Sequence, residues 1–152
     1  MTTTEFHNLL IEKFPFDLTL KQDVVLQRLS SFVFNTNSEK LFVLKGYAGT
    51  GKTTLISTLV NNLWHAHKSA VLLAPTGRAA KVISKYAKRE ALTIHKKIYF
   101  PKKQNGGAVS FVLQPNKHKN TIFIVDEASM IPDRPQNSKL FERGSLLDDL
   151  IS

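Results

Sequence analysis

The sequence predicts an α/β fold in which helices flank a parallel sheet. Three short apolar runs are typical of buried parallel strands and lie at residues 41–44, 70–74 and 121–125. Segments with apolar residues at helical spacing follow the first two runs. Strands that alternate with helices form right-handed βαβ units, so we expect the three strands to be parallel neighbours in one sheet.

Length and composition are those of one globular domain. The chain has 152 residues, of which 42% are hydrophobic, enough for a core and too many for a disordered chain. It has no cysteine, which excludes disulfides, zinc–cysteine sites and a cysteine nucleophile. No signal peptide and no membrane-spanning apolar stretch is visible, so we expect a cytoplasmic protein without a membrane partner.

The positive charge is concentrated in one part of the chain. The formal net charge is +9. Between Lys68 and Lys119 there are 12 basic residues and one acid, Glu90, so this segment carries +11 and the rest of the chain −2. Such a local excess favours an anionic partner, such as a nucleic acid, over the alternative of a charge that only aids solubility.

The N-terminal part, residues 1–38, is predicted to be helical. A short helix over residues 5–13 has apolar side chains at Phe6 and three and four positions later. A second helix starts after Thr19, with Gln22 at the capping-box position, and ends near Phe34. A polar turn at residues 35–38 then leads into the first strand.

The remaining core, residues 39–97 and 118–152, holds the strands and two more helices, over residues 52–65 and 78–88. We expect the second of these helices to bury Ala79, Val82, Ile83 and Tyr86. Between about residues 98 and 117, two β-type runs flank a Lys-Lys-Gln-Asn-Gly-Gly turn, which predicts an inserted β-hairpin.

A glycine-rich segment follows the first predicted strand. Residues 46–53 match the phosphate-loop pattern G-x-x-x-x-G-K-[ST] between a predicted strand and a predicted helix, a context that a chance glycine-rich turn rarely has. Its backbone N–H groups would converge on phosphate oxygens at a helix N-terminus, with Lys52 adding a full charge and Thr53 a hydroxyl ligand for Mg²⁺. This predicts a P-loop NTPase that binds ATP and Mg²⁺ through Gly46, Ala48, Gly49, Thr50, Gly51, Lys52, Thr53 and Thr54.

Two carboxylates follow the third predicted strand. Asp126 and Glu127 lie at its carboxyl end, where open α/β sheets bind ligands. Asp126 can hold the hydration shell of Mg²⁺, and Glu127 can accept a proton from an attacking water. The alternative is that Asp126 caps a following helix and Glu127 is merely solvated. With the phosphate loop earlier in the chain, we interpret Lys52, Asp126 and Glu127 as catalytic.

Four segments together resemble superfamily 1 DNA helicases of the RecD-like and Dda-like branch. They are Gly-Tyr-Ala-Gly-Thr-Gly-Lys-Thr-Thr at 46–54, Leu-Ala-Pro-Thr-Gly-Arg-Ala-Ala-Lys at 73–81, Thr-Ile-His at 93–95 and Ile-Val-Asp-Glu-Ala-Ser-Met at 124–130. The resemblance covers roughly residues 18–130. It implies a RecA-like motor lobe that uses ATP to move 5′ to 3′ on single-stranded DNA and to open a DNA fork.

The resemblance also implies roles for individual residues. Gln22 would read the adenine base, although its sequence position fits a capping box equally well. Single-stranded DNA would be held by two loops and the hairpin, through Pro75, Thr76, Gly77, Arg78, Thr93, His95, Lys102 and Lys103. The alternatives are an ordinary surface histidine and a plain surface hairpin.

Three features of the resembled helicases are missing from this sequence. There is no Gly-Asp pair for the segment that follows the second carboxylate site, no second RecA-like lobe and no late arginine that would reach the γ-phosphate. We therefore expect a single first lobe, residues 1–152, whose partner is the second lobe of the same full-length protein. Because an arginine from that lobe is worth about 10³–10⁵ in rate, the lobe alone should be a very poor ATPase. The alternatives are another P-loop NTPase and a nucleotide-gated DNA-binding module without turnover.

Overall fold

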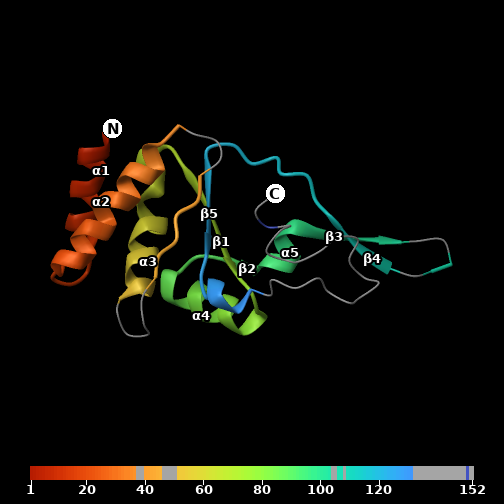
Figure 1. Ribbon diagram of the computed structural model, residues 1–152. Coiled ribbons are helices and arrows are strands. Elements are labelled where there is room, and N and C mark those ends of the chain that lie inside the picture. The colour runs from red at the N-terminus through yellow and green to blue at the C-terminus, as the bar shows by residue number, and fades with distance from the viewer. Residues whose placement is uncertain (37–39, 46–50, 104–105, 108, 132–149, 151–152) are drawn as a thin grey trace. The chain divides into compact units, whose positions relative to one another are not determined.

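The structure is a computed structural model, and it describes residues 1–36, 40–45, 51–103, 106–107, 109–131 and 150 (Figure 1). Its helices and strands, in chain order, are α1 (Thr3–Lys13), α2 (Leu20–Phe34), α3 (Lys52–Asn62), the 3₁₀ turn η1 (Leu63–Ala66), β1 (Ser69–Ala74), α4 (Gly77–Ala87), β2 (Ala91–Thr93), α5 (Ile94–Ile98), β3 (Tyr99–Lys103), β4 (Val109–Leu113), β5 (Thr121–Val125) and the 3₁₀ turn η2 (Ala128–Met130).

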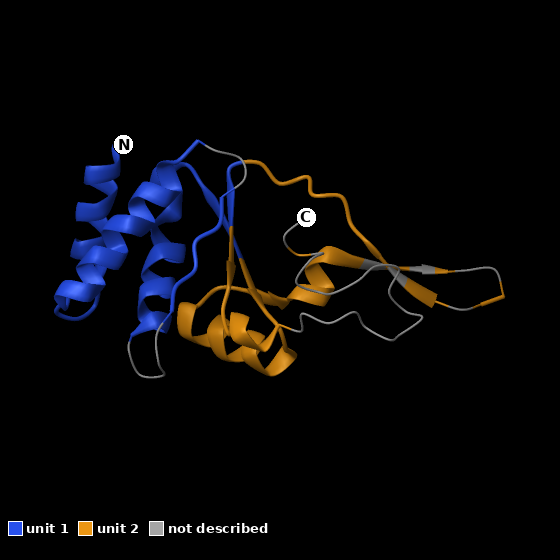
Figure 2. Cartoon of the chain, in the orientation of Figure 1, with its two compact units in different colours: residues 1–71, 120–122 blue, residues 72–119, 123–152 orange. Residues whose placement is uncertain are grey.

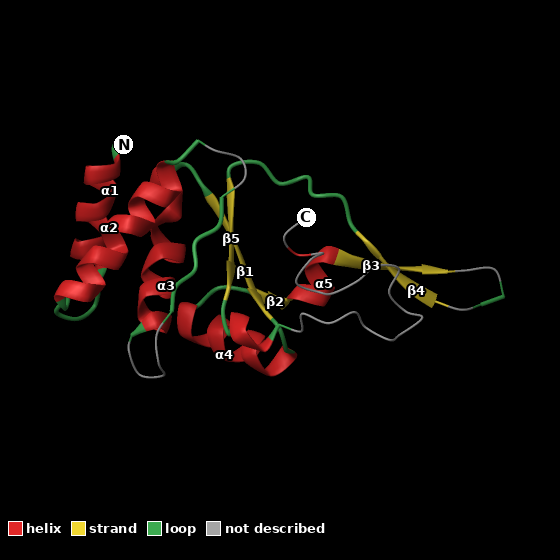
Figure 3. Cartoon of the chain, in the orientation of Figure 1, coloured by secondary structure: helices red, strands yellow, loops and turns green. Residues whose placement is uncertain are grey.

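Three strands of the α/β fold form one sheet with the order β2-β1-β5 (Figure 3). β1 and β2 are parallel, with Ala74 opposite Thr93. Along β5, the carbonyl of Asn120 accepts from the N–H of Ser69, and the N–H of Asp126 donates to the carbonyl of Leu73, so β5 runs in the same direction as β1. The predicted fold class, a parallel sheet with flanking helices, is therefore confirmed.

The chain divides into two compact units (Figure 2). Unit 1 contains residues 1–71 and 120–122, and unit 2 contains residues 72–119 and 123–152. The boundary falls within β1 and β5, so each unit holds part of each of these strands.

In unit 1, the predicted N-terminal helices pack against each other and α1 also packs on α3. The core residues include Phe6 and Leu10 of α1, Leu26 and Val33 of α2, and Val60 of α3, all of which are fully buried. The Phe6 ring meets the Phe34 ring edge-on at 5.8 Å, and His7 Nε2 lies 2.8 Å from Asp23 Oδ1. These contacts fix α1 on α2.

The segment 41–44, predicted as a buried strand, is not a strand in the structure. Leu41 and Val43 are 73% and 63% exposed, so its apolar residues do not share one buried environment. The segment is held beside α2 by side chains instead. Phe42 packs edge-on against Phe32, and Lys40 Nζ donates to the carbonyls of Phe32 and Asn35 at the end of α2. Burial, with Lys68 nearby, lowers the pKa of Lys40.

In unit 2, α4 packs on β2 through a face that differs from the prediction. Ala80, Ile83 and Ala87 are buried, whereas Val82 and Tyr86 are 62% and 49% exposed. The expectation that Val82 and Tyr86 face inward is therefore wrong. The small residues Ala80 and Ala87, which lie about one turn on either side of Ile83, let the helix backbone approach β2 closely.

The inserted hairpin is present as predicted. β3 and β4 pair antiparallel from Tyr99 opposite Leu113 to Lys103 opposite Val109. Ser110 is 1% exposed, and its hydroxyl has no hydrogen-bond partner among the described residues. In the part of the chain that the structure describes, no helix has the length and apolarity to cross a membrane.

Candidate functional site

The predicted phosphate loop leads into α3 at the edge of the described residues. Gly46, Ala48, Gly49 and Thr50 lie outside the described residues, and the structure resumes at Gly51. Gly51 has φ +83°, in the left-handed region that glycine adopts without steric cost. Lys52 and Thr53 are the first two residues of α3, both half-buried, and Thr54 is buried in the same turn. The helix therefore starts where the motif predicts.

The N-terminus of α3 differs from those of the other α-helices described. Each of the other four has a threonine N-cap whose hydroxyl accepts from a backbone N–H of the first turn: Thr2, Thr19, Thr76 and Thr93. The N-cap of α3 is Gly51, which offers no side-chain acceptor. The first N–H groups of a helix have no intrahelical partner, so an uncapped N-terminus suits an anion.

Gln22 lies against this glycine within unit 1. Its side-chain Oε1 accepts from the Thr19 backbone N–H at 2.9 Å, and its backbone N–H donates to Thr19 Oγ1 at 3.1 Å, so the capping box is formed. Its Nε2 would lie 2.8 Å from a Cβ built on Gly51. The carbonyl half of the amide is thus engaged in the cap and the NH₂ half faces the end of the phosphate loop. To donate to and accept from an adenine base at the same time, the Gln22 amide would have to give up its hydrogen bond from the Thr19 N–H.

The two carboxylates lie in unit 2, at the carboxyl end of β5. The Asp126 N–H donates to the Leu73 carbonyl at 3.0 Å, which holds the half-buried Asp126 beside the end of β1. Glu127 is exposed and has φ 58°, a left-handed conformation that costs a non-glycine residue about 1–2 kcal/mol. The N-cap of η2 is Glu127, whose carboxylate makes no capping hydrogen bond. The two readings of Asp126, as a magnesium ligand and as a helix cap, therefore both stay predictions.

The two predicted DNA-contacting loops are neighbours within unit 2. Because Ala74 pairs with Thr93, the loop that begins at Pro75 and the turn at Thr93–His95 leave adjacent strands at the same edge of the sheet. Thr76 and Thr93 cap α4 and α5, each accepting at 3.1 Å. Their hydroxyl protons remain available as donors, which is the group that a phosphate oxygen requires.

Around these two threonines the surface is open. Pro75 is half-buried, and Gly77 and Arg78 are exposed in the first turn of α4. A Cβ on Gly77 would meet nothing within 4 Å, so the protein itself does not require a glycine there. Burial lowers the pKa of His95, whose ring lies 5.8 Å from that of Tyr99, and this favours the neutral imidazole.

The hairpin residues stand apart from these loops in the chain. Lys102 pairs with Ser110, and Lys103, which is exposed, pairs with Val109 near the end of the hairpin. Gly106 and Gly107 follow, both with positive φ, as a tight turn requires. Residues 104–105 and 108 lie outside the described residues.

Sequence reasoning missed three features of these regions. It did not predict β2 and α5, which are only three and five residues long. It did not predict that the carbonyl oxygen of the Gln22 amide is engaged in the capping box while its NH₂ group faces Gly51. It also missed the basic face of α4, although Arg78, Lys81 and Lys85 repeat at helical spacing, a signal that the sequence does contain.

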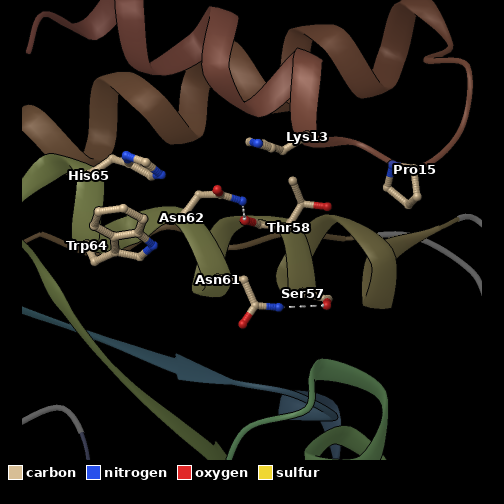
Figure 4. Close-up of a pocket in the computed structure, with 8 residues that line it drawn as sticks. All are labelled: Lys13, Pro15, Ser57, Thr58, Asn61, Asn62, Trp64 and His65. Carbon is tan, nitrogen blue, oxygen red and sulfur yellow. Dashed lines mark hydrogen bonds between the residues drawn. The ribbon is translucent and has the colours of Figure 1, made fainter.

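A groove of about 420 Å³ in unit 1 belongs to none of the predicted sites (Figure 4). It lies against the C-terminal half of α3, whereas the predicted nucleotide residues lie at the opposite end of that helix. Asn62 Nδ2 donates to the Thr58 carbonyl in its wall, and the exposed Trp64 stacks on His65 at 3.6 Å.

Comparison with known proteins identifies the family. The sequence profile of the AAA domain family matches residues 30–148, most of the chain. The chain belongs to the AAA domain family. An uncharacterized protein of Acanthamoeba polyphaga mimivirus is 29% identical to this AAA domain, over 73% of the chain and 27% of that protein. The ATP-dependent DNA helicase dda of Enterobacteria phage T4 is 36% identical, over 57% of the chain and 20% of that helicase.

The AAA domain thus spans 27% and 20% of the lengths of these two relatives. No solved structure matches the chain at a significant level. The profile and the helicase similarity together confirm the resemblance to the N-terminal lobe of a Dda-like superfamily 1 helicase. An ATP-binding, helicase-like P-loop domain is the function that these findings support.

Proposed function

We propose that this AAA domain is the first motor lobe of a DNA helicase, in which ATP hydrolysis drives movement along single-stranded DNA and opening of a fork. The observation that carries the proposal is the start of α3. Its N-terminus follows a left-handed glycine and has no side-chain cap, whereas the four other α-helices described each have a threonine cap. The helicase similarity supports the choice among P-loop enzymes.

ATP and Mg²⁺ fit the residues present. Gly51 leaves open the space that a Cβ would fill beside Gln22, and Lys52 lies in the first turn of α3. Thr53 and Asp126 would hold Mg²⁺, which neutralises charge on the phosphates when bound. Glu127 would accept a proton from the attacking water, and the second lobe of the full-length protein would supply the missing arginine.

Single-stranded DNA would bind at the sheet edge in unit 2. Thr76 and Thr93 would donate hydroxyl hydrogen bonds to phosphates, and Arg78 would add charge. Because burial favours its neutral form, His95 would act by hydrogen bonding or stacking rather than as a cation. Lys102 and Lys103 of the hairpin would contact the backbone near the fork. With about four phosphate contacts, log affinity for single strands should fall with log salt at a slope of roughly −3.

Nucleotide binding by the 152-residue chain tests the first part of the proposal. We expect the chain to bind a fluorescent ATP analogue in the presence of Mg²⁺, and Lys52→Ala to abolish that binding because the phosphates lose their cation. Lys13→Ala is the matched control, since Lys13 is an exposed lysine at the C-terminal end of α1 and belongs to no predicted nucleotide-binding segment. Unchanged ATP affinity in Lys52→Ala would exclude the phosphate-loop assignment.

Turnover requires a longer protein that includes both lobes. There, Glu127→Gln should retain ATP binding and lose DNA-stimulated hydrolysis, because the amide cannot accept the proton. Normal turnover in that variant would remove Glu127 from catalysis. Stimulation by RNA or by a protein, without any by DNA, would favour a different P-loop NTPase.

A further inference from the structure

Helix α4 presents two chemically distinct faces. Ala80, Ile83 and Ala87 form the buried face, which packs toward β2. The opposite face is exposed and carries Arg78, Lys81 and Lys85, with Lys88 at the C-cap. No acidic residue lies within the helix, and Glu90 is the one acid between Lys68 and Lys119.

The basic residues of this face make no ion pair with the part of the chain that the structure describes, as the lack of any salt bridge at Arg78, Lys81 and Lys85 shows. A folded protein gains little from keeping like charges on one helix face, because such pairs repel each other slightly. A row of this kind without ion pairs is therefore better explained by binding of an external anion than by a contribution to the stability of α4.

The spacing of the row suits a regular polyanion. Lys81 and Lys85 are four residues apart, which is about 6 Å along a helix, and the whole of α4 is about 16 Å long. Successive phosphates of one strand of B-form DNA advance by about 3.4 Å along the axis, so a helix laid along that axis passes alternate phosphates at an axial interval of about 6.8 Å. The helix can thus meet several phosphates without any change in its backbone.

The composition of the face favours a duplex over a single strand. Single strands are usually held by aromatic side chains on which bases stack. The exposed side of α4 carries the aliphatic Val82 and a single aromatic ring, that of Tyr86, which is 49% exposed. A rigid row of charges with one ring and no series of stacking rings is better matched to the backbone of a rigid duplex.

We propose that the exposed face of α4, formed by Arg78, Lys81, Lys85 and Lys88, binds the phosphate backbone of duplex DNA. This inference rests on the proposed function, because it places the duplex arm of a fork beside the loops that would hold the single strand. Arg78, in the first turn after Thr76, would lie where the two contacts meet.

The test measures binding of two DNA forms by the full 152-residue chain, using fluorescence anisotropy. The probes are a labelled blunt duplex of about 20 base pairs, longer than the roughly 16 Å helix, and a labelled single strand of about eight nucleotides. The test variant is Lys81→Gln/Lys85→Gln. The matched control is Lys13→Gln/Arg28→Gln, which removes the same charge from exposed positions of α1 and α2.

Loss of two phosphate contacts should make the salt slope for the duplex shallower by about 1.8 and weaken binding tenfold to a hundredfold near 0.1 M salt. The same variant should bind the single strand within about twofold of the unmodified chain, and the control variant should keep its duplex affinity. Because all four side chains are exposed, both variants should unfold at the same temperature as the unmodified chain.

Four results would overturn the inference. Duplex affinity could be unchanged in the α4 variant, with loss of binding to polyglutamate instead, which would make α4 a surface for an acidic protein. The α4 variant could lose both DNA forms equally, which would assign α4 to the single strand. The control could lose as much as the α4 variant, which would indicate a net-charge effect. Absence of binding to either DNA by the unmodified chain would refute the DNA part of the proposed function as well.

Discussion

The contact between Gln22 and Gly51 predicts a measurable energetic coupling between α2 and the phosphate loop. Substitution Gly51→Ala adds one Cβ at a residue with φ +83°, and that Cβ would lie 2.8 Å from Gln22 Nε2. The Gln22 amide is the flexible end of its side chain, but its Oε1 accepts from the Thr19 N–H. We therefore expect that moving the amide away from the methyl group breaks this hydrogen bond of the capping box.

The magnitude has two parts. A left-handed alanine costs about 1–2 kcal/mol relative to glycine. Loss of the hydrogen bond from the Thr19 N–H to Gln22 Oε1 adds about 1 kcal/mol. We expect Gly51→Ala to lower the free energy of unfolding by about 2–3 kcal/mol in all, and Gln22→Ala to lower it by about 1 kcal/mol.

The two substitutions should not be additive. In the Gln22→Ala background there is no amide to displace, so Gly51→Ala lowers the free energy of unfolding only by the cost of a left-handed alanine. The double variant should therefore be about 1 kcal/mol more stable than the sum of the single effects predicts. Urea unfolding of the four proteins, followed by circular dichroism, measures this difference. Gly77→Ala is the matched control, because a Cβ there meets nothing and φ is not positive.

Additivity would refute the reasoning. If the free energies of the double-mutant cycle add within about 0.3–0.5 kcal/mol, the Gln22 amide does not lie against Gly51 in solution. Gln22 would then be either a reader of the adenine base or a capping-box residue alone, the two roles that the sequence leaves open.

Three further predictions concern unit 2. Gly77→Ala should raise the free energy of unfolding by about 0.4–1 kcal/mol, measured by urea unfolding, since alanine restricts the unfolded chain and its Cβ meets nothing in the folded one. The same substitution should weaken single-strand binding, measured by anisotropy, if a phosphate approaches that backbone. Ser110→Ala should stabilise the chain by about 1 kcal/mol in thermal unfolding, because it removes a buried hydroxyl without a partner; a destabilised variant would show that the hydroxyl is satisfied. Burial lowers the pKa of folded His95 below its ordinary 6.5, so the unfolded chain takes up that proton first, and stability should fall as pH drops below about 6.5. His95→Gln should reduce this loss in urea unfolding at pH 7.5 and 5.5, and an identical pH dependence in both proteins would contradict the assignment.

The starts of α2 and α3 could be predicted from the sequence because short-range chemistry determines them. Thr19 and Gln22 are three residues apart, and their capping box depends on no distant contact. The same holds for Gly51 and Lys52, where a glycine must precede the helix for backbone reasons. The parallel sheet also followed from local apolar runs.

The errors occurred where the environment, and not the local sequence, decides. Apolar residues at 41–44 resemble a buried strand, but burial requires neighbours on both faces, and Leu41 and Val43 are exposed among the described residues. Val82 and Tyr86 fit helical periodicity as well as Ala80 and Ala87 do. The close packing of α4 on β2 selects the smaller pair, a preference that hydrophobicity alone does not express.

The Ala74–Thr93 pairing has a consequence for how the chain acquires its structure. The strand–helix–strand unit from β1 to β2 is complete within the 25 residues from Ser69 to Thr93. Contacts that are close in sequence lose little loop-closure entropy and form early, so this unit can assemble while later residues are still being synthesised. Both loops proposed to hold the single strand would then be in register before β5 and its carboxylates emerge.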